Sequence, residues 1–296
     1  MRMDHIRCLA DTRDICGEGC VWHPQQGAVF WTDINRGLLH RWVLATGELE
    51  TWQFDQPVTA VVLTTQEHLL AVILGGRIVL WDTRIHEETD VLFRLPGWPA
   101  VRCNDARVDP AGVLWFGTMQ NNVRSDGAAV DVTQWRGALY SLAVGEDAKE
   151  WYSGFGISNT MVWSPDGTTM YFGDTLANEL YRGAFDPVRS RLEGREVFFA
   201  GFQRGLPDGS TMDMEGHIWN CRYGGGCIVR IAPDGIISEI IETPVTNPTT
   251  CTFATVDDRA LLLFTSALDV TRADNPGSLF ALETKVQGLS STQLAL

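Results

Sequence analysis

Four residues with oxygen-bearing side chains occupy corresponding places in related segments of the chain. They are Glu18, Asn104, Asn159 and Asp208, and two further segments carry threonine there, Thr59 and Thr249. If these segments surround one axis, two carboxylates and two amides converge, and such an oxygen-rich set suits a hard divalent cation such as Ca²⁺, Mg²⁺ or Mn²⁺. One such residue before a strand often only caps a turn, so the prediction rests on the four together.

The elements that would position these residues are repeats. Six related segments each read as a short apolar strand, a turn with Gly, Pro or Asp, and a second strand rich in aromatic residues and leucine. They lie at residues 20–42, 60–82, 106–119, 161–182, 210–231 and 251–267. Further strands bring each unit to four, at a spacing of roughly 40–55 residues, which fits the radial blades of a propeller. We therefore predict an all-β fold, a six-bladed β-propeller, formed by residues 1–296 as a single domain.

The composition excludes several classes of partner. The formal charge of −14 and the isoelectric point of about 4.8 argue against nucleic acid and anionic membranes, which recruit basic surfaces. No segment approaches the roughly 20 apolar residues of a membrane span, and the amino terminus lacks a signal-peptide pattern. We expect a soluble cytoplasmic protein that is a monomer or a weak homo-oligomer.

The seven cysteines cannot all pair, and a chain of 296 residues can build a core without disulfides. Free thiols are therefore expected. Cys16 and Cys20 are separated by three residues, a spacing that leaves a structural metal site open, but there is no matching second pair. We favour cysteines buried in strands.

Four motifs together resemble the gluconolactonase/regucalcin (senescence marker protein) family. They are Gly17-Glu18-Gly19 with Trp22, Arg102-Cys103-Asn104-Asp105 with the following Asp109-Pro110-Ala111-Gly112, Ser158-Asn159 with Trp163-Ser164-Pro165-Asp166-Gly167, and Pro207-Asp208-Gly209 with Asp213 and Trp219. The similarity extends from about residue 14 to residue 283. It implies a propeller enzyme that hydrolyses a sugar lactone.

The resemblance also implies roles for individual residues. Glu18, Asn159 and Asp208 would hold one divalent metal ion, which we take to be Ca²⁺, Mg²⁺, Mn²⁺, Zn²⁺ or Fe²⁺. Asn104 would lie beside the metal, and Arg102 would orient the hydroxyl groups of the sugar. Asp208 is our candidate general base for the attacking water.

The sequence departs from the family pattern at several places. Cys20 replaces a proline, Ala106 and Thr160 replace glycines, and Ser210 stands where methionine is common. After Met119 the family often has an acidic residue that contacts substrate, whereas this chain has Gln120-Asn121-Asn122. We expect Asn121 to bind substrate through its neutral amide, with an altered sugar preference.

Two alternatives remain open at this stage. A phosphotriester hydrolase on the same scaffold would use the same cage to polarise a P=O bond. A non-catalytic calcium-binding propeller would need no Arg102 and would enclose its metal fully in protein. No G-x-S-x-G elbow, paired histidines or phosphate-binding glycine loop suggests other chemistry.

Overall fold

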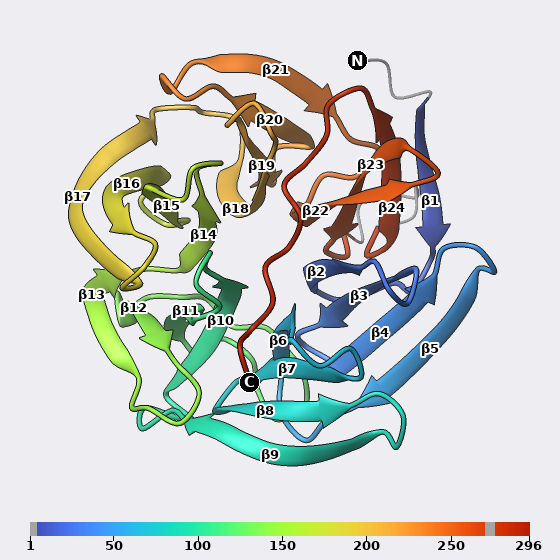
Figure 1. Ribbon diagram of the computed structural model, residues 1–296, viewed down its shortest axis with the longest axis vertical. Helices are drawn as coiled ribbons and strands as arrows, with labels where there is room; N and C mark the ends of the chain where they lie inside the picture. Colours follow the sequence, from blue (N-terminus) through green and yellow to red (C-terminus); the bar gives the residue numbers. More distant parts are fainter. Residues whose placement is uncertain (1–4, 270–275) are drawn as a thin grey trace.

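The computed structural model describes residues 5–269 and 276–296, and the regular elements in these residues are β-strands. Six four-stranded antiparallel sheets form a ring around one axis (Figure 1). The predicted six-bladed β-propeller is thereby confirmed. Within the described ranges, no helix has the length and apolar character needed to cross a membrane.

Each blade runs from an innermost strand at the axis to an outer strand at the rim. The innermost strands are β2 (Gly17–His23), β6 (Val58–Leu63), β10 (Val101–Val108), β14 (Ser158–Trp163), β18 (Leu206–Met212) and β22 (Pro248–Val256). The second strands are β3 (Ala28–Asp33), β7 (Leu69–Leu74), β11 (Leu114–Gln120), β15 (Thr169–Asp174), β19 (Ile218–Tyr223) and β23 (Arg259–Ser266). The third strands are β4 (Leu38–Val43), β8 (Arg77–Asp82), β12 (Gly137–Leu142), β16 (Glu179–Asp186), β20 (Cys227–Ile231) and β24 (Leu279–Thr284). The outer strands are β5 (Glu48–Gln53), β9 (Glu87–Arg94), β13 (Lys149–Phe155), β17 (Arg191–Ala200), β21 (Ile237–Glu242) and β1 (Ile6–Ala10).

The sixth blade closes the ring with strands from both ends of the chain. Its order is β1-β24-β23-β22, and β1 pairs antiparallel with β24, with Ile6 opposite Leu282. The amino-terminal strand therefore completes a sheet that otherwise comes from the last part of the chain.

Burial explains why the inner strands read as continuous apolar runs. Strands β6 and β7 are buried along their whole length because neighbouring blades cover both of their faces. The outer strand β5 instead alternates between half-buried and exposed residues. Apolar side chains from adjacent blades interdigitate, as Val21 and Phe30 of the first blade do with Val61 and Leu70 of the second. The core is thus divided among the interfaces between blades, which leaves the axis free for polar groups.

All six innermost strands contain a β-bulge near their beginning. The register of pairing with the second strand shifts between Glu18 and Val21, Val58 and Ala60, Cys103 and Ala106, Asn159 and Met161, Pro207 and Ser210, and Pro248 and Cys251. A bulge bends a strand locally and redirects a side chain. The repeated bulge therefore aims one residue of each blade at the axis.

The carboxy-terminal segment after β24 crosses the other end of the channel (Figure 1). The Leu289 amide donates to the Met212 carbonyl at 2.9 Å, and the Leu294 amide donates to the Leu63 carbonyl at 2.8 Å. Both acceptors are the last residues of inner strands, whereas Asp208 lies near the start of β18. The segment therefore covers the channel end that is distant from Asp208.

Candidate active site

The structure brings the four predicted axial residues together at one end of the channel. Asn104 Nδ2 lies 3.3 Å from Asn159 Oδ1, and Asn159 Nδ2 donates to Asp208 Oδ1 at 2.6 Å. Glu18 Oε2 accepts from the amide of Gly19 at 2.9 Å. All four side chains are at least nine-tenths buried. Residues from four blades, far apart in sequence, thus form one polar cluster.

Glycine is required beside Glu18. Gly19 has a φ of +61°, and a Cβ there would lie 2.7 Å from the Ala60 Cα of the next blade. Thr160 occupies the corresponding place after Asn159 and also has a positive φ, +52°, which is unusual for a β-branched residue. Its hydroxyl donates to the Asp208 carbonyl at 2.6 Å and lies 2.9 Å from Ser210 Oγ. The two departures from the family pattern, at 160 and 210, therefore contact each other.

A fully buried amide completes this support of Asp208. Asn220 Nδ2 donates to the Asp208 carbonyl at 3.0 Å and to Ser210 Oγ at 2.9 Å. Side chains from two blades thus hold the backbone that carries the Asp208 carboxylate.

The electrostatics of the cluster favour a cation. Burial and the nearby charge of Asp105 raise the pKa of Glu18 to about 7. Burial and the charge of Glu18 raise the pKa of Asp208 well above its usual range. Neither carboxylate forms an ion pair with a basic side chain in the described part of the chain, so a bound cation would stabilise their ionised forms. Two such carboxylates beside amide oxygens fit a hard divalent cation.

A cavity of about 640 Å³ opens over the cluster. Glu18, Asn104, Asn159 and Asp208 lie in its lining, together with Arg102. Apolar side chains contribute as well, namely Ile34, Met119, Val130, Val132, Ile157, Leu176 and Leu206. The polar cluster is therefore open to a small molecule, whereas a purely structural ion would be enclosed by protein.

The predicted substrate residues Arg102 and Asn121 have different surroundings. Arg102 lines the cavity, and its Nη1 donates to Asn104 Oδ1 at 2.7 Å. Asn121 does not line it, because its side chain turns away and donates to the Pro99 carbonyl at 3.0 Å. The neighbouring Asn122 lines the cavity instead and accepts from Arg102 Nε at 3.0 Å. Of the two neighbouring amides, Asn122 therefore lies in the cavity lining and Asn121 does not.

The long segment after β11 forms part of the same wall. Residues Val130–Thr133 line the cavity, and the carbonyl of Gly127 accepts from Asn35 Nδ2 of the first blade at 2.8 Å.

Two aspartates that the sequence analysis missed anchor the loops before Glu18 and Asn159. Asp33, at the end of β3, accepts from the amides of Ile15 and Cys16 at 3.0 and 3.3 Å. Asp174, at the end of β15, accepts from the amides of Gly156 and Ile157 at 2.9 and 3.2 Å. The signal was an aspartate at the same place in two repeats, in Trp-Thr-Asp and Phe-Gly-Asp.

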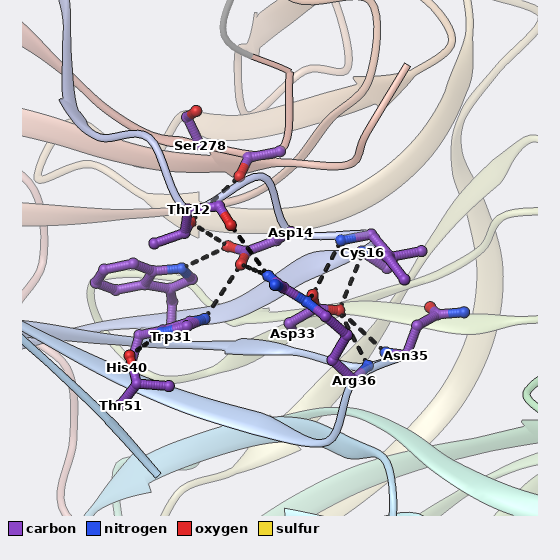
Figure 2. A network of polar contacts seen from close by, with 12 residues as sticks. Thr12, Asp14, Cys16, Trp31, Asp33, Asn35, Arg36, His40, Thr51 and Ser278 are labelled. Atoms are coloured by element: carbon purple, nitrogen blue, oxygen red, sulfur yellow. Dashed lines mark hydrogen bonds and ion pairs between the residues drawn. The ribbon is translucent and has the colours of Figure 1, made fainter. Parts of the chain in front are cut away.

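Figure 2 shows how Asp33 is itself held. Arg36 bridges Asp33 and Asp14, and Asp14 also accepts from Trp31 Nε1 at 2.8 Å. His40 Nε2 lies 3.1 Å from the same Asp14 carboxylate. This network fixes the segment that leads into β2 and hence the position of Glu18.

The cysteines are free thiols. Cys20 is buried among apolar residues that include Ala10 and Trp31, whereas Cys16 lines the cavity. The two thiols therefore have separate surroundings.

A second gathering of possible metal ligands lies outside the cavity. Potential ligand atoms of Asp213, Glu215 and His217 are within 4.8 Å of one another. However, Arg230 forms ion pairs with Asp213 and Glu215, and Trp219 Nε1 donates to Asp213. These carboxylates already have cationic and N–H partners, so the axial cluster is the better metal site.

Comparison with known proteins identifies the family. The profile of the SMP-30/gluconolactonase/LRE-like region matches residues 16–267. The chain belongs to this family.

Several relatives resemble the chain over nearly its whole length. It is 30% identical to an L-arabinolactonase of Azospirillum brasilense, over 97% of this chain and 94% of that protein. It is 31% identical to a pentonolactonase of Haloferax volcanii, over 95% and 94%. The crystal structure of regucalcin from Agrobacterium tumefaciens, described as a calcium-binding protein, superposes with a TM-score of 0.88 at 31% identity and covers 98% of this chain and 97% of that one. The family predicted from the four motifs is thus confirmed.

Proposed function

We propose that this protein hydrolyses a sugar lactone with the help of one divalent metal ion held by Glu18, Asn159 and Asp208. The observation that carries the proposal is the buried pair of carboxylates, with no ion-pair partner in the described residues, in the lining of an open cavity of about 640 Å³. Two relatives of the chain are named as an L-arabinolactonase and a pentonolactonase, which supports the same reaction.

The residues present fit such an ion by their chemistry. Glu18 and Asp208 offer carboxylate oxygens, and Asn159 offers an amide oxygen. When bound, the ion would act as a Lewis acid on the lactone carbonyl and stabilise the negative charge that develops there.

The protein's own side chains would accept the proton of the attacking water and orient the sugar. Asp208 would accept the proton of the attacking water, and the hydrogen bond from Asn159 fixes its carboxylate for this task. Arg102 and Asn104, joined by a hydrogen bond of 2.7 Å, would orient the sugar ring. The apolar side chains of Val130 and Val132 in the cavity wall would limit the access of water.

The test is a panel of neutral and acidic aldonolactones, assayed by acid release after treatment with EDTA and re-addition of Ca²⁺, Mg²⁺, Mn²⁺, Zn²⁺ or Fe²⁺. We expect turnover that disappears with EDTA and returns with at least one metal. Turnover of phosphotriesters but no lactone would instead favour the phosphotriesterase alternative. Tight calcium binding without any turnover would favour a binding protein.

A further inference from the structure

Arg102 is a buried cation without an anionic partner. Its side chain is 4% exposed, and it lines the cavity. Its acceptors are the Asn122 and Asn104 side-chain oxygens and the Cys103 carbonyl, at 2.7 to 3.0 Å. All of these acceptors are neutral. In the described part of the chain, no carboxylate forms an ion pair with this guanidinium.

One N–H group of Arg102 also lacks a hydrogen-bond acceptor. A guanidinium has five N–H groups. Nε uses one on Asn122, Nη1 uses two on Cys103 and Asn104, and Nη2 uses one on Asn122. The second N–H of Nη2 has no acceptor among residues 5–269 and 276–296. One donor is thus left for a molecule in the cavity.

Other arginines show that this arrangement is not general. Arg107 pairs with Asp105 at 3.1 Å, and Arg230 pairs with Asp213 at 2.8 Å. Arg222 is as buried as Arg102 and also has neutral partners, but three oxygens surround its Nη2, from Asn178, Phe202 and Gly205. Arg222 does not line the cavity. Its Nη1 has one acceptor, Asn220 Oδ1, so one N–H of Arg222 is likewise without an acceptor in the described residues. The difference is position, because Arg102 lies in the cavity lining, where a ligand can reach its remaining N–H.

The charges around Arg102 do not balance without a further anion. A divalent ion would offset the two carboxylates of Glu18 and Asp208, which leaves the charge of Arg102. The residue that accepts two of its N–H groups, Asn122, is a neutral amide. Asp131, which also lines the cavity, is exposed to solvent and is therefore screened. A buried cation of this kind is costly unless a ligand compensates it.

We propose that the substrate carries an anionic substituent, a carboxylate or a sulfonate, that Arg102 binds while the lactone lies at the Asp208 end of the cavity. This inference rests on the proposed lactonase function and names its substrate class, a lactone of an acidic sugar. The unpaired guanidinium selects against neutral lactones because they leave its charge uncompensated.

The first test compares matched lactones with the metal-loaded enzyme. D-glucaro-1,4-lactone has a carboxylate where D-glucono-1,4-lactone has a hydroxymethyl group, and 6-deoxy-6-sulfogluconolactone supplies the sulfonate. A charge-assisted hydrogen bond predicts that kcat/KM for an anionic lactone exceeds that for the neutral one by about 10- to 100-fold. The better of the two anionic lactones identifies the substituent.

The second test changes the charge beside Arg102. In Asn122→Glu a carboxylate would satisfy the guanidinium, so the anionic-to-neutral ratio of kcat/KM should fall by about 10-fold or more. The matched control Asn122→Gln keeps a neutral amide and should keep the ratio within about 3-fold.

A binding measurement separates this inference from the lactonase proposal. Calorimetry with glucarate and gluconate needs no turnover, and glucarate should bind about 10-fold more tightly. If neutral lactones are hydrolysed as well as acidic ones and Asn122→Glu does not change the ratio, the acidic substrate class is wrong and the lactonase function stands. If no lactone is hydrolysed, the function fails, and equal binding of glucarate and gluconate would overturn the role of Arg102 independently.

Discussion

The blades of this propeller differ in what they present to the axis, although all six have the same bulge. The first, third, fourth and fifth blades direct Glu18, Asn104, Asn159 and Asp208 into the cavity. The second and sixth blades place Thr59 and Thr249 at the corresponding positions, and their hydroxyls donate to the backbone carbonyls of Ile73 and Gly17. The bulge therefore sets direction, while the residue type decides whether an oxygen remains available to a ligand.

The anchoring of the loops also differs between the blades. In the first and fourth blades the second strand ends with an aspartate that holds the loop before the ligand, Asp33 and Asp174. In the second blade that strand ends with Leu74 and in the sixth with Ser266. The first and fourth blades thus have a loop-anchoring aspartate that the threonine blades lack, whereas the fifth blade, which carries Asp208, ends its second strand with Tyr223.

Asp208→Asn should give the largest effect, because Asp208 is asked both to bind metal and to accept a proton. The variant keeps a carbonyl oxygen but loses the base, so kcat at saturating metal should fall by about 100-fold or more. Metal affinity, measured by calorimetry, should fall modestly with the loss of one negative charge. If excess metal restored the original kcat, Asp208 would be a ligand only.

Glu18→Gln and Asn159→Ala test the proposed metal ligands of the first and fourth blades directly. Changing a residue that only holds a metal ligand in place already weakens metal binding by about 10-fold or more, so loss of a direct ligand should raise the metal Kd at least as much. The circular dichroism spectrum should be unchanged, because the core lies between the blades. Unaltered affinity in either variant would remove that residue from the ligand set.

Asp174→Asn tests the loop anchor of the fourth blade. The side-chain amide of asparagine accepts the hydrogen bonds from the Gly156 and Ile157 amides more weakly than the carboxylate does. The loop should therefore loosen, and the metal Kd should rise by up to about 10-fold. Asp166→Asn is the matched control, since Asp166 holds a turn between β14 and β15 in the same blade. A loss of affinity in the control equal to that in Asp174→Asn would mean that general destabilisation of the blade is responsible.

Thr59→Val should have the smallest effect. The change keeps the shape of the side chain and removes one hydrogen bond to Ile73, at a cost of about 1 kcal/mol in the free energy of unfolding. Metal Kd, measured by titration, should stay the same. A clear rise in the metal Kd would show that the second blade also contributes to the metal site, so the threonine blades would not differ from the others in this respect.

The sequence predicted the fold and the axial residues because both depend on repeated patterns. The paired strands of each unit and the oxygen-bearing residue before its first strand recur visibly. The bulges could not be predicted, since Gly19 and Thr160 share a positive φ without sharing a residue type. Asn121 and Asn122 could not be distinguished either, because the loop leaves β11 without a regular alternation that would fix which side chain faces inward.

The closure of the sixth blade has a consequence for synthesis of the protein. Strand β1 leaves the ribosome first, yet its partner β24 follows only after nearly the whole chain has been made. At a translation rate of about 5–20 residues per second, β1 waits on the order of 15–60 s. Glu18 lies just after β1, and the sixth blade separates its blade from that of Asp208, so the nascent chain cannot complete the cage early. Metal loading is therefore expected to be a late event that follows the synthesis of β24.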